Sequence, residues 1–357
     1  MDTFETFPEQ DEAKALLRSA LAEEPAHAYL FYGPRGVGKR RAAFVFAGEL
    51  LGDAQRVARR AHPDLYVLEP LGGQIRIDPI RELRRDLHMR PFEASRRVYL
   101  VFRADLMNED AADALLKDLE EPPDYAVVVL VADDLGPLPP TIRSRCQLVP
   151  FRRLSQRAVK AHLSSRGLEG EQLEALARIA GGRLDRAKAL LDPAAATRRQ
   201  RLLEVARAVY ADPDFEPAAA AEVVLQAMRE RGAAAKELAE AELEGLDLTT
   251  REAEQRARRA QRGAEREELL ASLDELAAWY RDLIAAAVGA GDAVVHLDRK
   301  DQLAEDGTLE RMLAAERASE FVLATWRDAE ELNVNASLSL EALFVQLRRE
   351  LASAHAV

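Results

Sequence analysis

The chain has 357 residues, enough for about two or three domains that each bury a core. Hydrophobic residues make up 48% of it but aromatic residues only 6%, so Ala, Leu and Val must build most of the core, which favours helices. The formal net charge of −12 argues against a protein that coats nucleic acid, and the single cysteine, Cys146, excludes an internal disulfide framework and a multi-cysteine zinc site.

The amino-terminal segment is acidic, with Asp2, Glu5 and Glu9, and lacks the basic and apolar regions of a secretory leader. The apolar stretch at residues 283–290 is too short for a membrane helix, which needs about 18 residues. We therefore expect a cytoplasmic protein with no membrane contact.

Short apolar segments alternate with segments of helical periodicity up to about residue 152. The predicted strands are 28–32, 64–68, 98–102, 126–132 and 147–151. Helical periodicity lies between them, as at 80–88 and 108–120. This alternation predicts an α/β domain at residues 1–152, with a parallel sheet flanked by helices.

Residues 33–40, Gly-Pro-Arg-Gly-Val-Gly-Lys-Arg, connect the first predicted strand to a predicted helix, as in a phosphate-binding loop. The expected phosphate contacts come from Gly33, Gly36, Gly38 and Lys39, because glycine lets backbone N–H groups approach phosphate oxygens and lysine adds a charge. Arg40, however, stands where a working loop has the Ser or Thr that ligates Mg²⁺. We therefore predict a degenerate loop that is kept for its turn geometry, with the phosphate site empty or weakly filled.

The acidic pair that should complete such a site is also missing. An Asp that holds the metal and a Glu that orients water would follow the strand at 98–102, and there the chain has Phe102 and Arg103. Asp105 is expected to cap the next helix, or its approach, rather than to bind metal. Intrinsic ATP hydrolysis should therefore be negligible, with no metal site and no cofactor of the chain's own.

After residue 152 the strand pattern disappears. Three short helices are expected at 155–166, 171–180 and 184–191, forming a lid at 153–193 that is followed by an all-helical domain at 194–357. Residues 229–268 are rich in Arg, Glu and Ala, which predicts a solvated helix or helical hairpin, with a basic DNA-contacting arm as the alternative. The aromatic residues expected in the core of this domain are Trp279, Tyr280, Phe321, Trp326 and Phe344.

Two motifs close the α/β region. Residues 115–123 read Leu-Leu-Lys-Asp-Leu-Glu-Glu-Pro-Pro, and residues 140–146 read Pro-Thr-Ile-Arg-Ser-Arg-Cys. Together, at this spacing, they resemble the AAA+ subunits of bacterial DNA polymerase III clamp loaders. Other segments similar to this family are 62–64, 77–83, 90–93 and 333–338, and the likeness is weakest at about 229–300.

The resemblance implies an AAA+ fold with a parallel-sheet domain, a helical lid and a helical collar through which subunits assemble. It also gives Arg145, next to Ser144 in its motif, the role of an arginine finger that reaches the γ-phosphate of ATP-Mg²⁺ bound by a neighbouring subunit. A finger supplied in this way accelerates hydrolysis ~10³–10⁵-fold. The alternative for Arg145 is a plain salt bridge at a domain edge.

Further departures separate the chain from the ATP-hydrolysing members that it resembles. Asp133 and Asp134 stand where those members have a polar phosphate sensor, and acidic groups would repel phosphate. In the lid, Asp185 takes the place of the second sensor arginine, although Arg183 and Arg186 leave the register open. The four-cysteine module that precedes His62 in many members is absent, so no zinc is expected and His62 is interpreted as a turn residue.

The predicted function is that of a non-hydrolysing stator in a five-membered ring that loads a sliding clamp onto DNA. The expected partners are the clamp-loader ATPase subunits and the delta subunit and, through the complex, the sliding clamp and primed DNA. Two alternatives stay open: an AAA+ ATPase active in its own right, and an interaction scaffold in which Arg145 is incidental. A direct DNA contact through Arg81, Arg84, Arg85 and Arg90 is a further hypothesis, with a solvated basic face as its alternative.

Overall fold

The computed structural model describes residues 3–70, 74–243, 250–331 and 335–353, so the family-like positions Asn333 and Val334 lie outside the described residues. The chain divides into two units: residues 1–165 with 181–186, and residues 166–180 with 187–357. The three helices expected at 153–193 are α7 (Gln156–Ser164) in the first unit, α8 (Gly170–Ile179) in the second, and α9 (Leu184–Ala189), which crosses the division. These helices are confirmed, while the boundaries of the three predicted domains stay a prediction.

One parallel sheet forms the centre of the first unit, with the strand order β2-β3-β4-β1-β5. Its strands are β1 (Ala28–Tyr32), β2 (Leu65–Leu68), β3 (Arg97–Phe102), β4 (Ala126–Ala132) and β5 (Gln147–Pro150). The predicted strands are thus confirmed, with shifts of a single residue at some ends. Because β1 lies between β4 and β5, with Tyr32 opposite Ala132 and Pro150, the carboxyl ends of three strands meet at one edge of the sheet.

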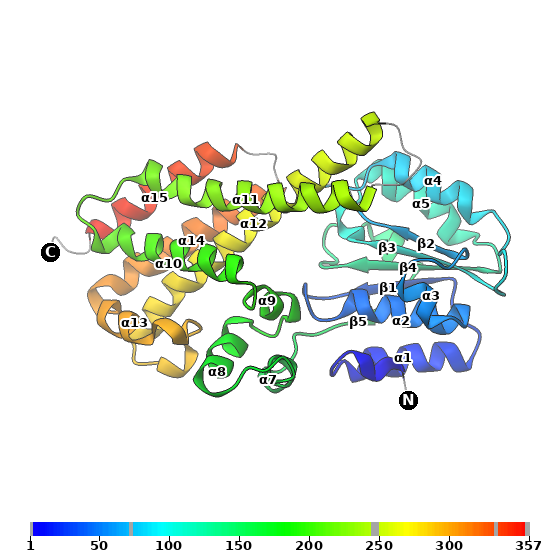
Figure 1. Cartoon of the computed structure of the whole chain (residues 1–357), viewed down its shortest axis with the longest axis horizontal. Helices are drawn as coiled ribbons and strands as arrows, with labels where there is room; N and C mark the ends of the chain where they lie inside the picture. The colour runs from blue at the N-terminus through cyan, green and yellow to red at the C-terminus, as the bar shows by residue number, and fades with distance from the viewer. Residues whose placement is uncertain (1–2, 71–73, 244–249, 332–334, 354–357) are drawn as a thin grey trace. The chain divides into compact units, whose positions relative to one another are not determined.

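Helices cover both faces of this sheet, which explains why every residue of β3 and β4 is buried. On one face lie α1 (Asp11–Ala22), α2 (Lys39–Leu51) and α3 (Ala54–Ala58), and on the other α4 (Ile77–Leu87) and α5 (Glu109–Glu120) (Figure 1). Side chains alternate along β3, so Leu100 and Phe102 pack with the α2 residue Phe46, whereas Tyr99 and Val101 pack with the opposite helices. The end of β3 therefore turns Phe102 toward α2.

Three short elements complete the first unit. They are η1 (Thr3–Thr6), η2 (Ala104–Leu106) and α6 (Pro140–Arg143). The single turn of α6 begins after Pro139, with Pro140 at its first position, and it ends just before the Ser-Arg-Cys motif.

The second unit is helical throughout its described residues. After α8 it contains α10 (Pro193–Ala211), α11 (Pro217–Leu243), α12 (Thr250–Ala287), η3 (Gly291–Ala293), η4 (Leu297–Arg299), α13 (Lys300–Asp306), α14 (Leu309–Glu331) and α15 (Ala336–Ser353). Trp279, Tyr280 and Phe344 are fully buried, and Phe321 and Trp326 are partly buried against the same core. The predicted aromatic core is confirmed.

The described residues of the charged segment at 229–268 are helical, as predicted. Its first part belongs to α11 and its second to α12, and these two helices pack along one another (Figure 1). Charges of both signs pair on its surface, for example Arg229 with Glu222 and Arg258 with Glu254. These ion pairs explain how a helical segment with few large apolar residues is stable in contact with solvent.

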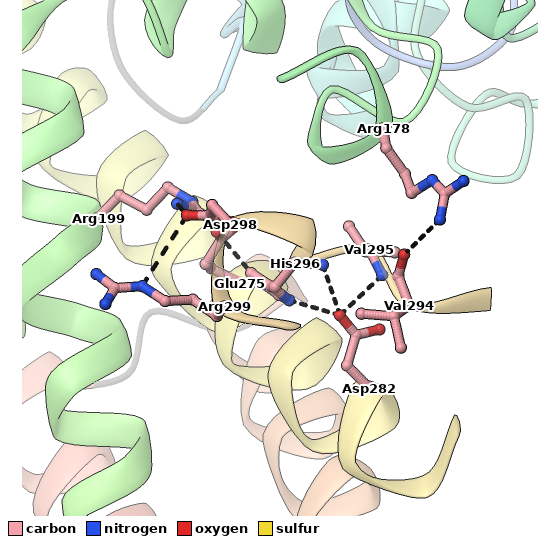
Figure 2. Close-up of polar contacts among 9 residues, drawn as sticks. All are labelled: Arg178, Arg199, Glu275, Asp282, Val294, Val295, His296, Asp298 and Arg299. Atoms are coloured by element: carbon pink, nitrogen blue, oxygen red, sulfur yellow. Dashed lines mark hydrogen bonds and ion pairs between the residues drawn. The ribbon is translucent and has the colours of Figure 1, made fainter. Parts of the chain in front are cut away.

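A buried polar cluster ties the segment after α12 to the helices around it (Figure 2). His296 is fully buried, with Nδ1 2.7 Å from Asp282 Oδ2 and Nε2 3.2 Å from Glu275 Oε1. The same Asp282 oxygen accepts the backbone N–H of His296 at 2.8 Å. Arg199 of α10 donates to Glu275 at 2.5 Å and pairs with Asp298 at 2.7 Å. The cluster therefore joins α10, α12 and η4 through charge-assisted contacts.

Among the described residues, none of the helices combines the length and apolar character that crossing a membrane requires.

Candidate functional site

The phosphate-binding-type loop lies at the edge of the sheet where β1 ends and α2 begins, which is the predicted context. Gly33 has a φ of 133°, and a Cβ there would lie 2.0 Å from the carbonyl oxygen of Phe151. Gly36 has a φ of 75°, and a Cβ there would lie 1.7 Å from Asp185 Oδ1. Glycine is therefore required at both positions by the protein's own packing, with or without a phosphate.

Lys39 is the first residue of α2, and its side chain is turned back into its own loop. The ammonium group donates to the carbonyl oxygens of Gly33 at 2.5 Å and Pro34 at 2.7 Å, and it lies 2.8 Å from Asp133 Oδ1. An ammonium has three hydrogens, so these three partners use all of its donors. Burial lowers the pKa of Lys39, and the charge of Asp133 opposes that shift. Asp133 thus supplies the negative charge that a phosphate would supply in a nucleotide-binding loop.

Arg40 and Phe102 occupy the corner that would hold Mg²⁺. The Arg40 guanidinium lies 4.4 Å from the centroid of the Phe102 ring and pairs with Glu69 Oε1 at 2.5 Å. Arg40 stands where the hydroxyl residue was expected, and Phe102 stands where the metal-holding Asp was expected. These two side chains are therefore in contact and form a cation–π pair. Neither side chain offers an oxygen to a metal, so this corner does not fit ATP-Mg²⁺.

Arg103 and Asp105 form a second charged group beside Asp133. Arg103 has a left-handed φ of 56°, and its Nε lies 3.4 Å from Asp105 Oδ2 and 3.2 Å from Asp133 Oδ2. Asp105 accepts the backbone N–H of Asp133 at 2.9 Å, and burial raises its pKa. The prediction that Asp105 caps the following helix is wrong, because Asn108 caps α5 by accepting the N–H of Ala111 at 3.1 Å. Asp105 instead connects the ends of β3 and β4.

Asp185, in the segment 181–186, lies against Gly36 of the loop. Its place in the family's sensor register stays a prediction. Its carboxylate accepts Arg183 Nη2 at 3.0 Å and the backbone N–H of Arg186 at 2.8 Å, and the N–H of Leu184 donates to Gly36 O at 2.8 Å. Burial opposes ionisation of Asp185, but Arg183, the backbone N–H of Arg186 and Arg35 together outweigh it and lower the pKa. The segment 181–186 therefore presents an ionised carboxylate to the loop.

Arg145 lies in the short segment that connects α6 to β5. Its Nη2 is 2.5 Å from Glu120 Oε1, and its Nη1 donates to the carbonyl oxygen of Thr141 at 3.0 Å and to Ser144 Oγ at 3.4 Å. Ser144 Oγ in turn donates to Thr141 O at 3.0 Å. About a third of the Arg145 side chain, 33%, is exposed, so it can reach a group outside the chain.

The single cysteine and the turn histidine are structural. Burial raises the pKa of the Cys146 thiol to about 12. His62 Nδ1 accepts the backbone N–H of Asp64 at 3.1 Å, which agrees with the predicted turn role. Asp64 itself accepts the backbone N–H groups of Phe92 at 2.6 Å and Glu93 at 3.0 Å, so two family-like segments meet here. No group of three or more metal-ligating side chains occurs among the described residues.

Three of the four arginines that were considered for DNA contact share one surface of α4. Arg81, Arg84 and Arg85 line an open depression of about 440 Å³ together with His88. The buried Asp118 pairs with Arg84, and its Oδ1 lies 3.2 Å from His88 Nε2. DNA contact stays a prediction.

The sequence did not predict the acidic partners of Arg40 and Arg145. Glu69 and Glu120 were assigned no role, although Glu120 stands in one of the two motifs that carry the family resemblance. In the sequence, the motif at 115–123, which contains Glu120, precedes β4, and the motif at 140–146, which contains Arg145, follows it. Only the fold shows that these two motifs are in contact.

Residues 9–155 match the family model described as DNA polymerase III, delta subunit. The chain is 32% identical over 178 residues to the DNA polymerase III subunit delta' of Bacillus subtilis, covering 46% of this chain and 54% of that protein. It is 39% identical over 168 residues to the delta' subunit of Pseudomonas aeruginosa, covering 42% and 50% respectively. The chain thus spans about half the length of these curated relatives.

A gamma subunit-related DNA polymerase III protein of Thermotoga maritima is similar in structure, with a TM-score of 0.45 and 17% identity over 96% of this chain and 100% of that one. The family-model match covers the α/β region, which contains the loop at 33–40 and both motifs. The chain is accordingly delta-prime-like in its α/β region, where it is similar to the delta' subunits of DNA polymerase III.

Proposed function

We propose that this chain is a non-hydrolysing delta-prime subunit, a stator that donates Arg145 to ATP held by a neighbouring clamp-loader ATPase. The observation that carries the proposal is that all three donors of Lys39 are used by the protein's own oxygens, one of them from Asp133. A triphosphate would have to displace this carboxylate and would still find no metal ligand at Arg40 and Phe102. The loop therefore serves as a structural element.

Arg145 can act outside the chain because its guanidinium is exposed in part and permanently charged. In hydrolysis of ATP, negative charge on the transferred phosphoryl group is spread over its oxygens in the transition state. A guanidinium placed there stabilises that charge without reorganising, which is the role of an arginine finger. Ser144 Oγ helps to hold the Arg145 guanidinium, because it accepts a hydrogen bond from Arg145 Nη1 and donates one to the carbonyl oxygen of Thr141.

The partners follow from the family. Relatives are named as delta' and tau subunits of DNA polymerase III, so we propose that the chain assembles with ATPase subunits of the gamma/tau type and with the delta subunit. The hetero-oligomer would act on the sliding clamp and primed DNA in the cytoplasm. The second unit would supply the collar.

The test is the ATPase rate of the reconstituted complex with Arg145→Ala. Turnover at the adjacent ATP site should fall ~10³-fold or more, because the finger is worth ~10³–10⁵ in related phosphoryl transfers. The total ATPase rate that primed DNA stimulates should then fall by the share that this site contributes. Arg145→Lys should restore little of it, since a point charge cannot replace the planar fork, and Arg157→Ala on α7 is the exposed-arginine control.

Two results would contradict the proposal. Normal assembly and unchanged turnover with Arg145→Ala would favour a pure scaffold. Tight, metal-dependent binding of ATP to the isolated chain by titration calorimetry would favour an ATPase active in its own right.

A further inference from the structure

We propose that Glu120 is the positioning residue for Arg145, holding the guanidinium in the orientation that the neighbouring phosphate requires. This inference rests on the proposed function and adds a residue to it. The two family-like motifs, at 115–123 and 140–146, contribute one partner each to a 2.5 Å ion pair between Glu120 Oε1 and Arg145 Nη2.

Glu120 is fixed by its place in the chain. It is the last residue of α5, and Pro122 and Pro123 follow, which prevents the helix from continuing. The chain then enters β4, which pairs with β1 and β3 inside the sheet. The backbone that carries the carboxylate is therefore held by two rigid elements.

The helix itself gives no reason for a carboxylate at this position. The carboxyl end of a helix carries partial negative charge, so an acid in the last turn is unfavourable there. The pair with Arg145 offsets this cost, but the Glu120 side chain is 47% exposed, and exposed ion pairs contribute little to stability. Orientation of Arg145 explains the contact better than stability does.

The contacts leave part of the guanidinium available. Nη1 is held by Thr141 O and Ser144 Oγ, and Nη2 by Glu120, whereas Nε–H and a second Nη2–H have no partner among the described residues. Arginine has five N–H donors in a planar fork, and a phosphate can take two of them at once. Glu120 thus restrains a long, flexible side chain on one side and keeps donors free for a phosphate on the other.

The experiment compares variants of this chain in the reconstituted complex, with primed DNA and ATP. Glu120→Gln should lower kcat at the adjacent site by roughly 10- to 100-fold, the scale expected when a catalytic group is misplaced by about 1 Å. The KM for ATP should change little, because the neighbour binds the nucleotide. Glu120→Asp should recover part of the rate, and Glu121→Gln, one residue further on, is the matched control that should behave as wild type.

A double-mutant cycle separates positioning from a general structural effect. In the Arg145→Ala background, Glu120→Gln should cause no further loss, because its effect passes through the missing guanidinium. A further loss in that background, a rate increase with Glu120→Gln, or equal losses with Glu120→Gln and Glu121→Gln would overturn the inference. An unchanged rate with Glu120→Gln alone would overturn it while leaving the proposed function intact, whereas an unchanged rate with Arg145→Ala would remove the proposed function itself.

Discussion

At the level of single residues, the side chains of the loop at 33–40 have their contacts within the chain itself. Asp133 neutralises Lys39 in place of a phosphate, and Phe102 stacks on Arg40 where a metal would be held. Asp185 packs against Gly36, so that the loop backbone is covered by a carboxylate. These contacts hold the loop in its shape, as the proposed structural role requires.

Gly36→Ala tests how tightly Asp185 closes the loop. Gly36 and Gly52 both have a positive φ, of 75° and 71°, but a Cβ at Gly52 would meet nothing within 4 Å. Gly52→Ala should therefore lower the free energy of unfolding by only about 1–2 kcal/mol, because the alanine must adopt the left-handed backbone conformation. Gly36→Ala should cost about 1–3 kcal/mol more, because Asp185 must move.

Urea unfolding of the two alanine variants measures this difference directly. The double variant Gly36→Ala, Asp185→Ala should lose most of the extra cost, since it removes the atoms that clash. Equal costs at Gly36 and Gly52 would show that Asp185 does not pack on the loop.

At the level of elements, two of the polar contacts described above lie at the end of a helix or just after it. The end of α5 supplies Glu120, and the segment after α12 is held by the cluster around His296 (Figure 2). Burial lowers the pKa of His296, and the negative charge of Asp282 opposes that shift. Arg199 donates a hydrogen bond to Glu275. Folding of the second unit thus shifts His296 toward its neutral form.

The stability of the second unit should therefore depend on pH through His296. A histidine whose pKa is lowered in the folded state takes up a proton on unfolding, so stability is complete above the unfolded pKa of about 6.5 and is lost as the pH falls below it. The slope contributed by one such group is at most about 1.4 kcal/mol per pH unit.

Both tryptophans of the chain, Trp279 and Trp326, lie in the second unit, so their fluorescence follows its unfolding. Urea titrations at pH 7.5 and 5.5 should show a larger loss of stability on acidification for the wild type than for His296→Gln. The same pH dependence in both proteins would contradict a buried neutral His296.

At the level of the whole molecule, the proposed assembly needs apolar surface that the isolated chain leaves exposed. On α15, Leu338 is 65% exposed and Val345 54% exposed, and these residues are seven positions apart, on one side of the helix. On α14, Leu309 and Leu313 are also exposed, four positions apart. Exposed apolar side chains grouped in this way are typical of surfaces that are buried on assembly.

The double variant Leu338→Ser, Val345→Ser should fold as the wild type does, with a change of about 0.5 kcal/mol or less in the free energy of unfolding, because both side chains are already in solvent. Its incorporation into the complex should weaken by an order of magnitude or more. Gel filtration with the partner subunits measures this, and Leu238→Ser on α11, at a residue 63% exposed, is the matched control. Wild-type assembly of the double variant would exclude this face of α15 from the collar contact.

The sequence by itself determined the strands, the helices of the remaining chain and the likeness to DNA polymerase III delta' subunits, because periodicity and short motifs are local properties of a chain. Only the tertiary structure decided which side chains meet: Lys39 with Asp133, Arg40 with Phe102, and Arg145 with Glu120. It also corrected the role of Asp105, since a cap and a link between strand ends look alike in one dimension. These pairs depend on the order of strands in the sheet, which brings distant segments to one edge, and local sequence patterns do not encode that order.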